Sequence, residues 1–109
     1  MTLDDARAAA LALEGVEERS HFNRPDFRVG GRVFMTLHED KGCVMLVLPV
    51  ELQSALVEAD PDVYLTELLG GWAKYGSTLV SVGALAAAEF GEVLEAAWEH
   101  RARRARKRG

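Results

Sequence analysis

The fold of this chain is decided by residues 21–37, which read HFNRPDFRVGGRVFMTL. Gly30 and Gly31 can both take the positive φ that a two-residue type I′ turn requires, and apolar residues alternate on either side of them. The stretch therefore predicts a β-hairpin in which Phe27 lies opposite Phe34. The expected face of this pair also holds Val29 and Arg32, and the other face holds Asp26, Arg28, Val33 and Met35.

Helical periodicity lies on both sides of this strand region. Thr2 and Asp5 form an approximate capping box, and the helix they start is expected to stop at Gly15. Strands are predicted at about 26–29, 32–38 and 43–48, a helix at 49–59, strands near 63–66 and 78–82, and a last helix from about residue 86. The order α-βββ-α-ββ-α predicts an α+β two-layer sandwich, with about five antiparallel strands and helices on one face.

The charge is divided unevenly along the chain. Residues 1–100 hold 7 Lys/Arg against 17 Asp/Glu, a net charge of −10, and the last nine residues add six basic side chains to give −4 overall. We therefore expect a single domain over residues 1–100 and a basic C-terminal tail, residues 101–109, that extends the last helix. We expect a cytoplasmic protein, because residues 1–18 do not read as a signal peptide and no apolar run is long enough to span a membrane.

The hairpin block also resembles that of the MmcQ/YjbR family, whose members carry a similar F-x-x-P-x-F-R-V-G-G-K-x-F pattern. Here the pattern begins at Phe22 and has Arg32 where Lys is common. The likeness extends over nearly all of residues 3–100, although the stretch after Trp72 is longer than usual and Gly83 replaces a frequent acidic residue. The resemblance implies a fold of the secretion-chaperone type and a DNA-binding role.

No catalytic or metal-binding pattern stands out. The three histidines lack helical ligand spacing, Cys43 has no partner cysteine, and the acidic pairs Glu39/Asp40 and Asp60/Asp62 suit turns. We therefore expect a protein that is not an enzyme and needs neither cofactor nor metal. Among the histidines, His21 is the candidate to watch, because polar residues surround it.

A small-ligand site is a further hypothesis. The Gly-rich stretch 69–76 lacks a phosphate-loop pattern, but its aromatic and cationic side chains could form an edge on which a planar group stacks. The candidate ligand-contacting residues are His21, Arg24, Trp72, Lys74 and Tyr75.

The first functional hypothesis is a small nucleic-acid-binding module that contacts phosphates. Its candidate residues are Arg28, Arg32, Arg101, Arg103, Arg104, Arg106, Lys107 and Arg108. The alternative is a protein-interaction or chaperone-like module, expected to be a homodimer or to hold a client protein. It rests on the prediction that both sheet faces are apolar, with Val33, Met35 and Leu37 on the face away from the helices.

Overall fold

The computed structural model describes the backbone of residues 1–108 and their side chains, except those of Leu68 and residues 105–108. Over this range the chain forms three α-helices: α1 (Leu3–Leu11), α2 (Val50–Ala59) and α3 (Ala87–Arg108). The six strands are β1 (Val16–His21), β2 (Arg24–Val29), β3 (Arg32–His38), β4 (Cys43–Val47), β5 (Tyr64–Leu65) and β6 (Ser77–Ser81). Three 3₁₀ segments connect them: η1 (Glu39–Lys41), η2 (Glu67–Tyr75) and η3 (Val82–Ala84).

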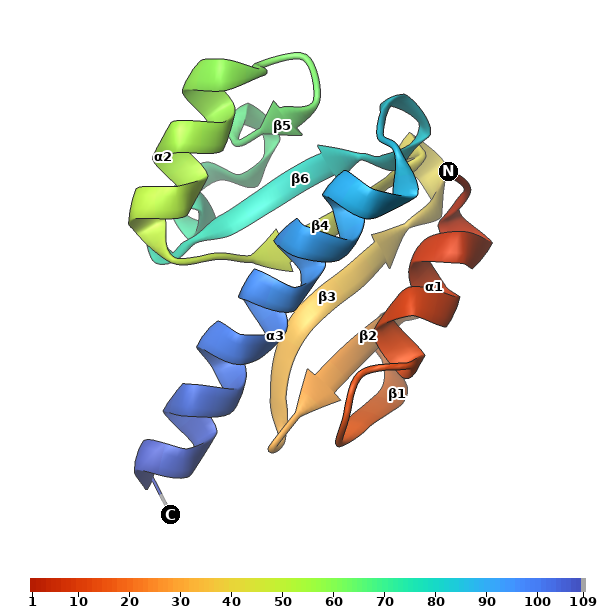
Figure 1. The fold of residues 1–109 in the computed structure, drawn as a ribbon, viewed down its shortest axis with the longest axis vertical. Coiled ribbons are helices and arrows are strands. Elements are labelled where there is room, and N and C mark those ends of the chain that lie inside the picture. The colour runs from red at the N-terminus through yellow and green to blue at the C-terminus, as the bar shows by residue number, and fades with distance from the viewer. Residues whose placement is uncertain (109) are drawn as a thin grey trace.

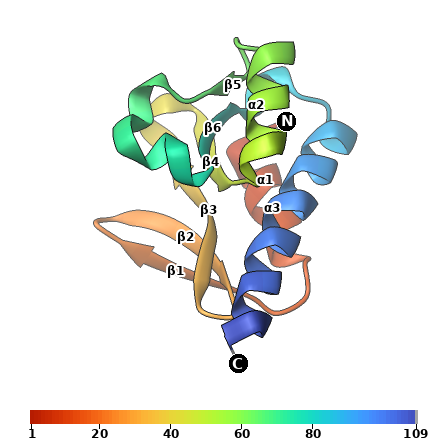
Figure 2. The same cartoon turned by 90° about the vertical axis from the view of Figure 1, so that its left-hand side faces the viewer.

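The strands form one antiparallel sheet in the order β1-β2-β3-β4-β6-β5. The helix α3 crosses in front of the middle strands, with α1 beside it (Figure 1). Seen after a 90° turn, the three α-helices lie on one side of the sheet, while η2 and the β1–β2 turn project on the other (Figure 2). The predicted α+β architecture with helices on one face is therefore confirmed.

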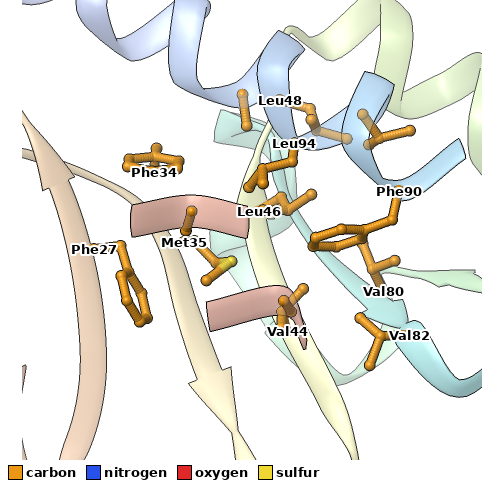
Figure 3. Packing of buried hydrophobic residues seen from close by; sticks show 14 of the residues in the cluster. Phe27, Phe34, Met35, Val44, Leu46, Leu48, Val80, Val82, Phe90 and Leu94 are labelled. Carbon is orange, nitrogen blue, oxygen red and sulfur yellow. The ribbon is translucent and has the colours of Figure 1, made fainter. Parts of the chain in front are cut away.

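The core fills the space between the sheet and these helices. Phe27, Phe34 and Phe90 are completely buried in it (Figure 3). The further buried side chains labelled there are Met35, Val44, Leu46, Leu48, Val80, Val82 and Leu94. The helix α1 begins as predicted, with reciprocal hydrogen bonds between Thr2 and Asp5. The core and the α-helices thus occupy one face of the sheet, and the opposite face forms the candidate site.

The hairpin turn is confirmed, but its predicted register is wrong. Gly30 and Gly31 have φ of 57° and 77°, and Val29 pairs with Arg32 as expected. The register then shifts between Phe27 and Arg28, so that Phe27 pairs with Met35 instead of Phe34. The extra residue on β3 is a β-bulge, which lets Phe34 and Met35 both reach the core.

Two further expectations are corrected. The sheet has six strands because the largely polar residues 16–21 form an edge strand, β1, whose alternation carries little apolar signal. The second sheet face is also less apolar than predicted, since Met35 and Leu37 belong to the helix-side core. That second face carries Asp26 and Thr36, which pair with each other across β2 and β3.

Candidate functional site

The second sheet face holds a cleft of about 590 Å³, which we call the sheet cleft. One wall is the β1–β2 turn and the other is η2, the two segments that project from this side of the sheet (Figure 2). Its volume lies within the usual ~300–1,000 Å³ of small-molecule sites. The cleft is lined by His21, Arg24, Val33, Thr36, His38, Met45, Val47, Leu69, Trp72, Tyr75, Ser77 and Arg101.

The β1–β2 turn places two predicted ligand residues at the rim of the cleft. Phe22 and Asn23 both take positive φ, 52° and 62°, and the chain reverses there so that His21 pairs with Arg24. Arg24 donates hydrogen bonds to the backbone oxygen of Leu37 and to the carboxylate of Asp40, each at 3.3 Å. These contacts hold the Arg24 guanidinium over β3, next to the cleft.

A buried carboxylate orients His21. Asp26 is fully buried and accepts from Nδ1 of His21 at 2.6 Å, and from Nε and Nη2 of Arg28 at 2.8 and 3.1 Å. The Arg28 hydrogen bonds, with a smaller contribution from His21, lower the pKa of Asp26 and keep it ionised. Because Asp26 engages the Arg28 guanidinium in this way, Arg28 is a poor candidate for the predicted phosphate contact.

His38 is a cleft residue that the sequence did not single out. Its Nε2 lies 3.0 Å from Oγ1 of Thr36, and its Nδ1 is buried without a partner in the described part of the chain. Burial, helped by the nearby charges of Arg24 and Lys41, lowers the pKa of His38 to about 4. The imidazole is therefore neutral at pH 7. Because side chains alternate along a strand, His38 could have been predicted to lie on the same sheet face as Thr36, two residues earlier.

The aromatic wall is held in place by a buried side chain. Trp72 and Tyr75 are 70% and 66% exposed on η2, which ends at Gly76 with φ 99°. From α2, Nε2 of Gln53 donates to the backbone oxygens of Ala73 and Ser77 at 2.9 and 3.0 Å. The sequence predicted a flexible connection here. The sequence did carry one indication that this segment is held in place: Gln53 is a polar residue on the otherwise apolar stripe of α2.

Lys74 lies outside the sheet cleft, although it was predicted beside Trp72 and Tyr75. Its Nζ is 5.3 Å from the centre of the Tyr75 ring, within cation–π range. Lys74 instead lines a smaller depression of about 390 Å³, which we call the junction hollow. Tyr75 and Arg101 line both the junction hollow and the sheet cleft, so the two depressions adjoin.

The end of α3 forms a third depression, the helix-end hollow, of about 600 Å³. Arg32 from the hairpin turn lines it together with the helix residues Glu99, His100, Arg103 and Arg104. His100 and Arg104 also line the junction hollow. The three depressions thus adjoin in a row from the hairpin turn, past the end of α3, to the aromatic wall, and we call this row the track.

Arg101 stands at the centre of this track. Its Nε donates to the backbone oxygen of Val33 at 2.9 Å, where β3 extends beyond its pairing with β4. Burial, together with the charges of Arg32 and Arg104, lowers the pKa of Arg101. Part of this lowering comes from the like charges of Arg32 and Arg104, and an anion bound beside Arg101 would offset them.

The predicted basic residues differ in whether a carboxylate already pairs with them, and so in whether they are free to contact phosphate. Arg103 pairs with Glu99 at 2.7 Å across one helical turn, whereas none of the described carboxylates is within ion-pair distance of Arg32, Arg101 or Arg104. Arg106, Lys107 and Arg108 belong to α3, but their side chains lie outside the described residues. Arg32, Arg101 and Arg104 are consequently the best-placed phosphate ligands of the predicted set.

Residues 1–108 contain no cluster of three or more His, Cys, Asp or Glu side chains suited to a metal ion, as far as their side chains are described. Cys43 is buried, with Sγ 3.4 Å from the backbone oxygen of Lys41 and 3.7 Å from Oγ of Ser81. No helix within the described range is long and apolar enough to cross a membrane.

The architecture and the cleft define a class of small α+β domains with an open sheet face. The YjbR family model matches residues 11–100, and the chain belongs to that family. Among solved structures, it is similar to the Deinococcus radiodurans protein DR2400, a protein with a DUF419 domain. That similarity has a TM-score of 0.72 and 24% identity, and covers 89% of this chain and 75% of the other. No curated protein matches this chain.

Proposed function

We propose that this YjbR-family domain is a non-enzymatic module that binds nucleic acid through phosphate contacts at the end of α3. The observation that carries the proposal is the group formed by Arg32, Arg101 and Arg104, three arginines that line the adjoining depressions and lie outside ion-pair distance of the described carboxylates. Phosphate oxygens are the natural ligands of such a group, because guanidinium donors match them geometrically. The DNA-binding role implied by the family resemblance agrees with this chemistry.

The charge of the rest of the domain limits the footprint of a polyanion. Residues 1–100 are net −10, and Glu51 and Glu99 lie at the junction hollow and the helix-end hollow. A long polyanion is therefore attracted at the basic end and repelled elsewhere. Contacts to phosphate alone also carry no sequence information, so we expect binding to be nearly indifferent to sequence.

The test is the affinity of an Arg32→Gln/Arg104→Gln variant for a labelled duplex DNA across a range of salt concentrations. We expect weaker binding and a log–log salt slope shallower by about 0.9 for each phosphate that the variant no longer neutralises. The matched control is Arg7→Gln/Arg19→Gln, which removes the same charge from arginines paired with Glu18 and Glu17. Equal affinity and slope for the first variant and the wild type would contradict the proposal.

The protein-interaction alternative loses part of its basis. It required an apolar second sheet face, yet Met35 and Leu37 pack in the helix-side core, and Asp26 and Thr36 occupy the second face. The exposed aromatic residue Trp72 lines a cleft with cationic neighbours, not a uniformly apolar surface. We therefore favour nucleic acid over a client protein or a second copy of the chain.

A further inference from the structure

We propose that the sheet cleft takes an unpaired nucleobase, so that the preferred ligand is a single strand and not a duplex. This inference rests on the proposed function, since the phosphates of the same strand would lie on the arginines at the end of α3. The inference assigns a role to the sheet cleft, whereas the proposed function involves only the arginines at the end of α3.

The aromatic wall presents its rings in a way that suits stacking. Two large aromatic rings, Trp72 and Tyr75, remain mostly exposed on a segment that Gln53 fixes at Ala73, the residue next to Trp72. Exposed rings on a fixed backbone lose little conformational freedom when a planar group stacks on them. Aromatic platforms of this kind bind bases irrespective of their identity, because every base has a π-face.

The surfaces inside the cleft combine apolar and cationic groups. Val33, Met45 and Val47 offer apolar contacts from the sheet, while Arg24 and Arg101 bring positive charge to the same depression. A base attached to a sugar phosphate has both parts, a planar ring and an anion. A purely apolar ligand would make no use of the positive charge of Arg24 and Arg101, and a free phosphate would make no use of the aromatic wall.

The cleft also adjoins the depressions at the basic end of α3. Arg101 and Tyr75 belong to both the sheet cleft and the junction hollow, and Arg104 continues the lining into the helix-end hollow. A strand can therefore follow the arginines with its phosphates and place a base against Trp72. In a duplex the bases are paired and stacked inside, so the cleft would stay empty unless the duplex opened.

The experiment compares a labelled oligodeoxythymidylate, which does not pair with itself, with a duplex of the same length. Trp72→Ala should weaken binding of the oligodeoxythymidylate about 5- to 150-fold, as expected when one stacked base no longer has its ring partner. It should leave duplex binding unchanged. Leu11→Ala is the matched control, because Leu11 is a large apolar side chain, 45% exposed on α1, that lines none of the three depressions, and it should leave both affinities unchanged.

Quenching of tryptophan emission by the oligodeoxythymidylate gives a second readout on the unmodified chain, and Trp72→Phe should remove most of it. Unchanged oligodeoxythymidylate affinity in Trp72→Ala, or an equal loss for the duplex, would overturn the cleft assignment. If Arg32→Gln/Arg104→Gln still weakened binding, the phosphate proposal would stand without it. A wild-type chain that bound neither probe at low salt would overturn both proposals.

Discussion

Gly76 is the residue whose backbone conformation most constrains the aromatic wall. It has φ +99°, and a Cβ built there would lie 2.0 Å from the backbone oxygen of Leu48. The same two residues are joined by a hydrogen bond from the Leu48 amide to the Gly76 oxygen at 2.9 Å. The end of η2 is thus locked against the segment that leads from β4 into α2.

Gly76→Ala should consequently destabilise the domain far more than Gly31→Ala. Gly31 also has positive φ, but its Cβ position is open, so alanine there meets only the left-handed strain of about 1–2 kcal/mol. At Gly76 the backbone clash adds to that strain, and we expect a loss of about 4 kcal/mol or more. Chemical denaturation of the two variants checks this. Equal losses would mean that η2 does not pack as described.

His38 makes stability depend on pH between about 4 and 6.5. Its pKa is lowered to about 4 in the folded chain by burial and by Arg24 and Lys41, while Asp40 acts in the opposite direction. The unfolded chain therefore binds the proton first as pH falls, and the contribution of neutral His38, complete above pH 6.5, is lost as pH falls toward 4. The lowered pKa of His100 acts with the same sign.

Thermal melts of the wild type and His38→Gln between pH 4 and 7 test this dependence. The wild type should lose more of its melting temperature on acidification than the variant does, because glutamine does not titrate. Parallel curves for the two proteins would show that His38 is not buried in its neutral form.

At the scale of elements, α3 is both a core helix and the carrier of the basic group. Its apolar stripe reaches beyond Trp98, since Ala102 is also buried, and Nε of Arg101 donates a hydrogen bond to the backbone oxygen of Val33. Residues 101 and 102 of the helix therefore pack against the rest of the domain.

Two truncations separate the roles of α3. Removal of residues 101–109 should lower the free energy of unfolding by about 1–3 kcal/mol, since it exposes core surface and leaves the Val33 carbonyl without its donor. Removal of residues 105–109 keeps these two contacts and should cost much less. Urea titrations of both chains give the comparison, and equal stability of the two truncated chains would contradict the packing described for Arg101 and Ala102.

The elements also show how far the sequence alone could predict the structure. Gly30-Gly31 with its flanking apolar residues was sufficient for the hairpin, and the predicted order of helices and strands for the α+β class, because these are local patterns. The β-bulge was not predictable, since nothing local distinguishes Phe34 from Met35 as the partner of Phe27. Polar β1 was missed because its pairing depends on β2 and not on its own residues.

At the scale of the whole molecule, the candidate site joins segments that are distant in sequence. His21, Arg24, Trp72 and Tyr75 were each proposed as ligand residues, and the structure places all of them around one cleft. The inclusion of Arg101 was not predictable, because it depends on where α3 crosses the end of β3. The sequence suggested a ligand edge and a basic tail as two separate hypotheses. The packing of α3 against the sheet places the residues of both along the three adjoining depressions.

Nucleic acid should follow this track from the end of α3 to the aromatic wall. The most direct measurement is an NMR titration of the full chain with the oligodeoxythymidylate, followed through the two indole N–H signals. Trp72 is exposed at the cleft, whereas the indole of Trp98 donates to the backbone oxygen of Glu14 at 2.9 Å. We expect a large shift for Trp72, shifts of the Arg32 and Arg101 amides, and a much smaller shift for Trp98. Shifts confined to residues away from the three depressions, or no shifts at low salt, would contradict this binding path.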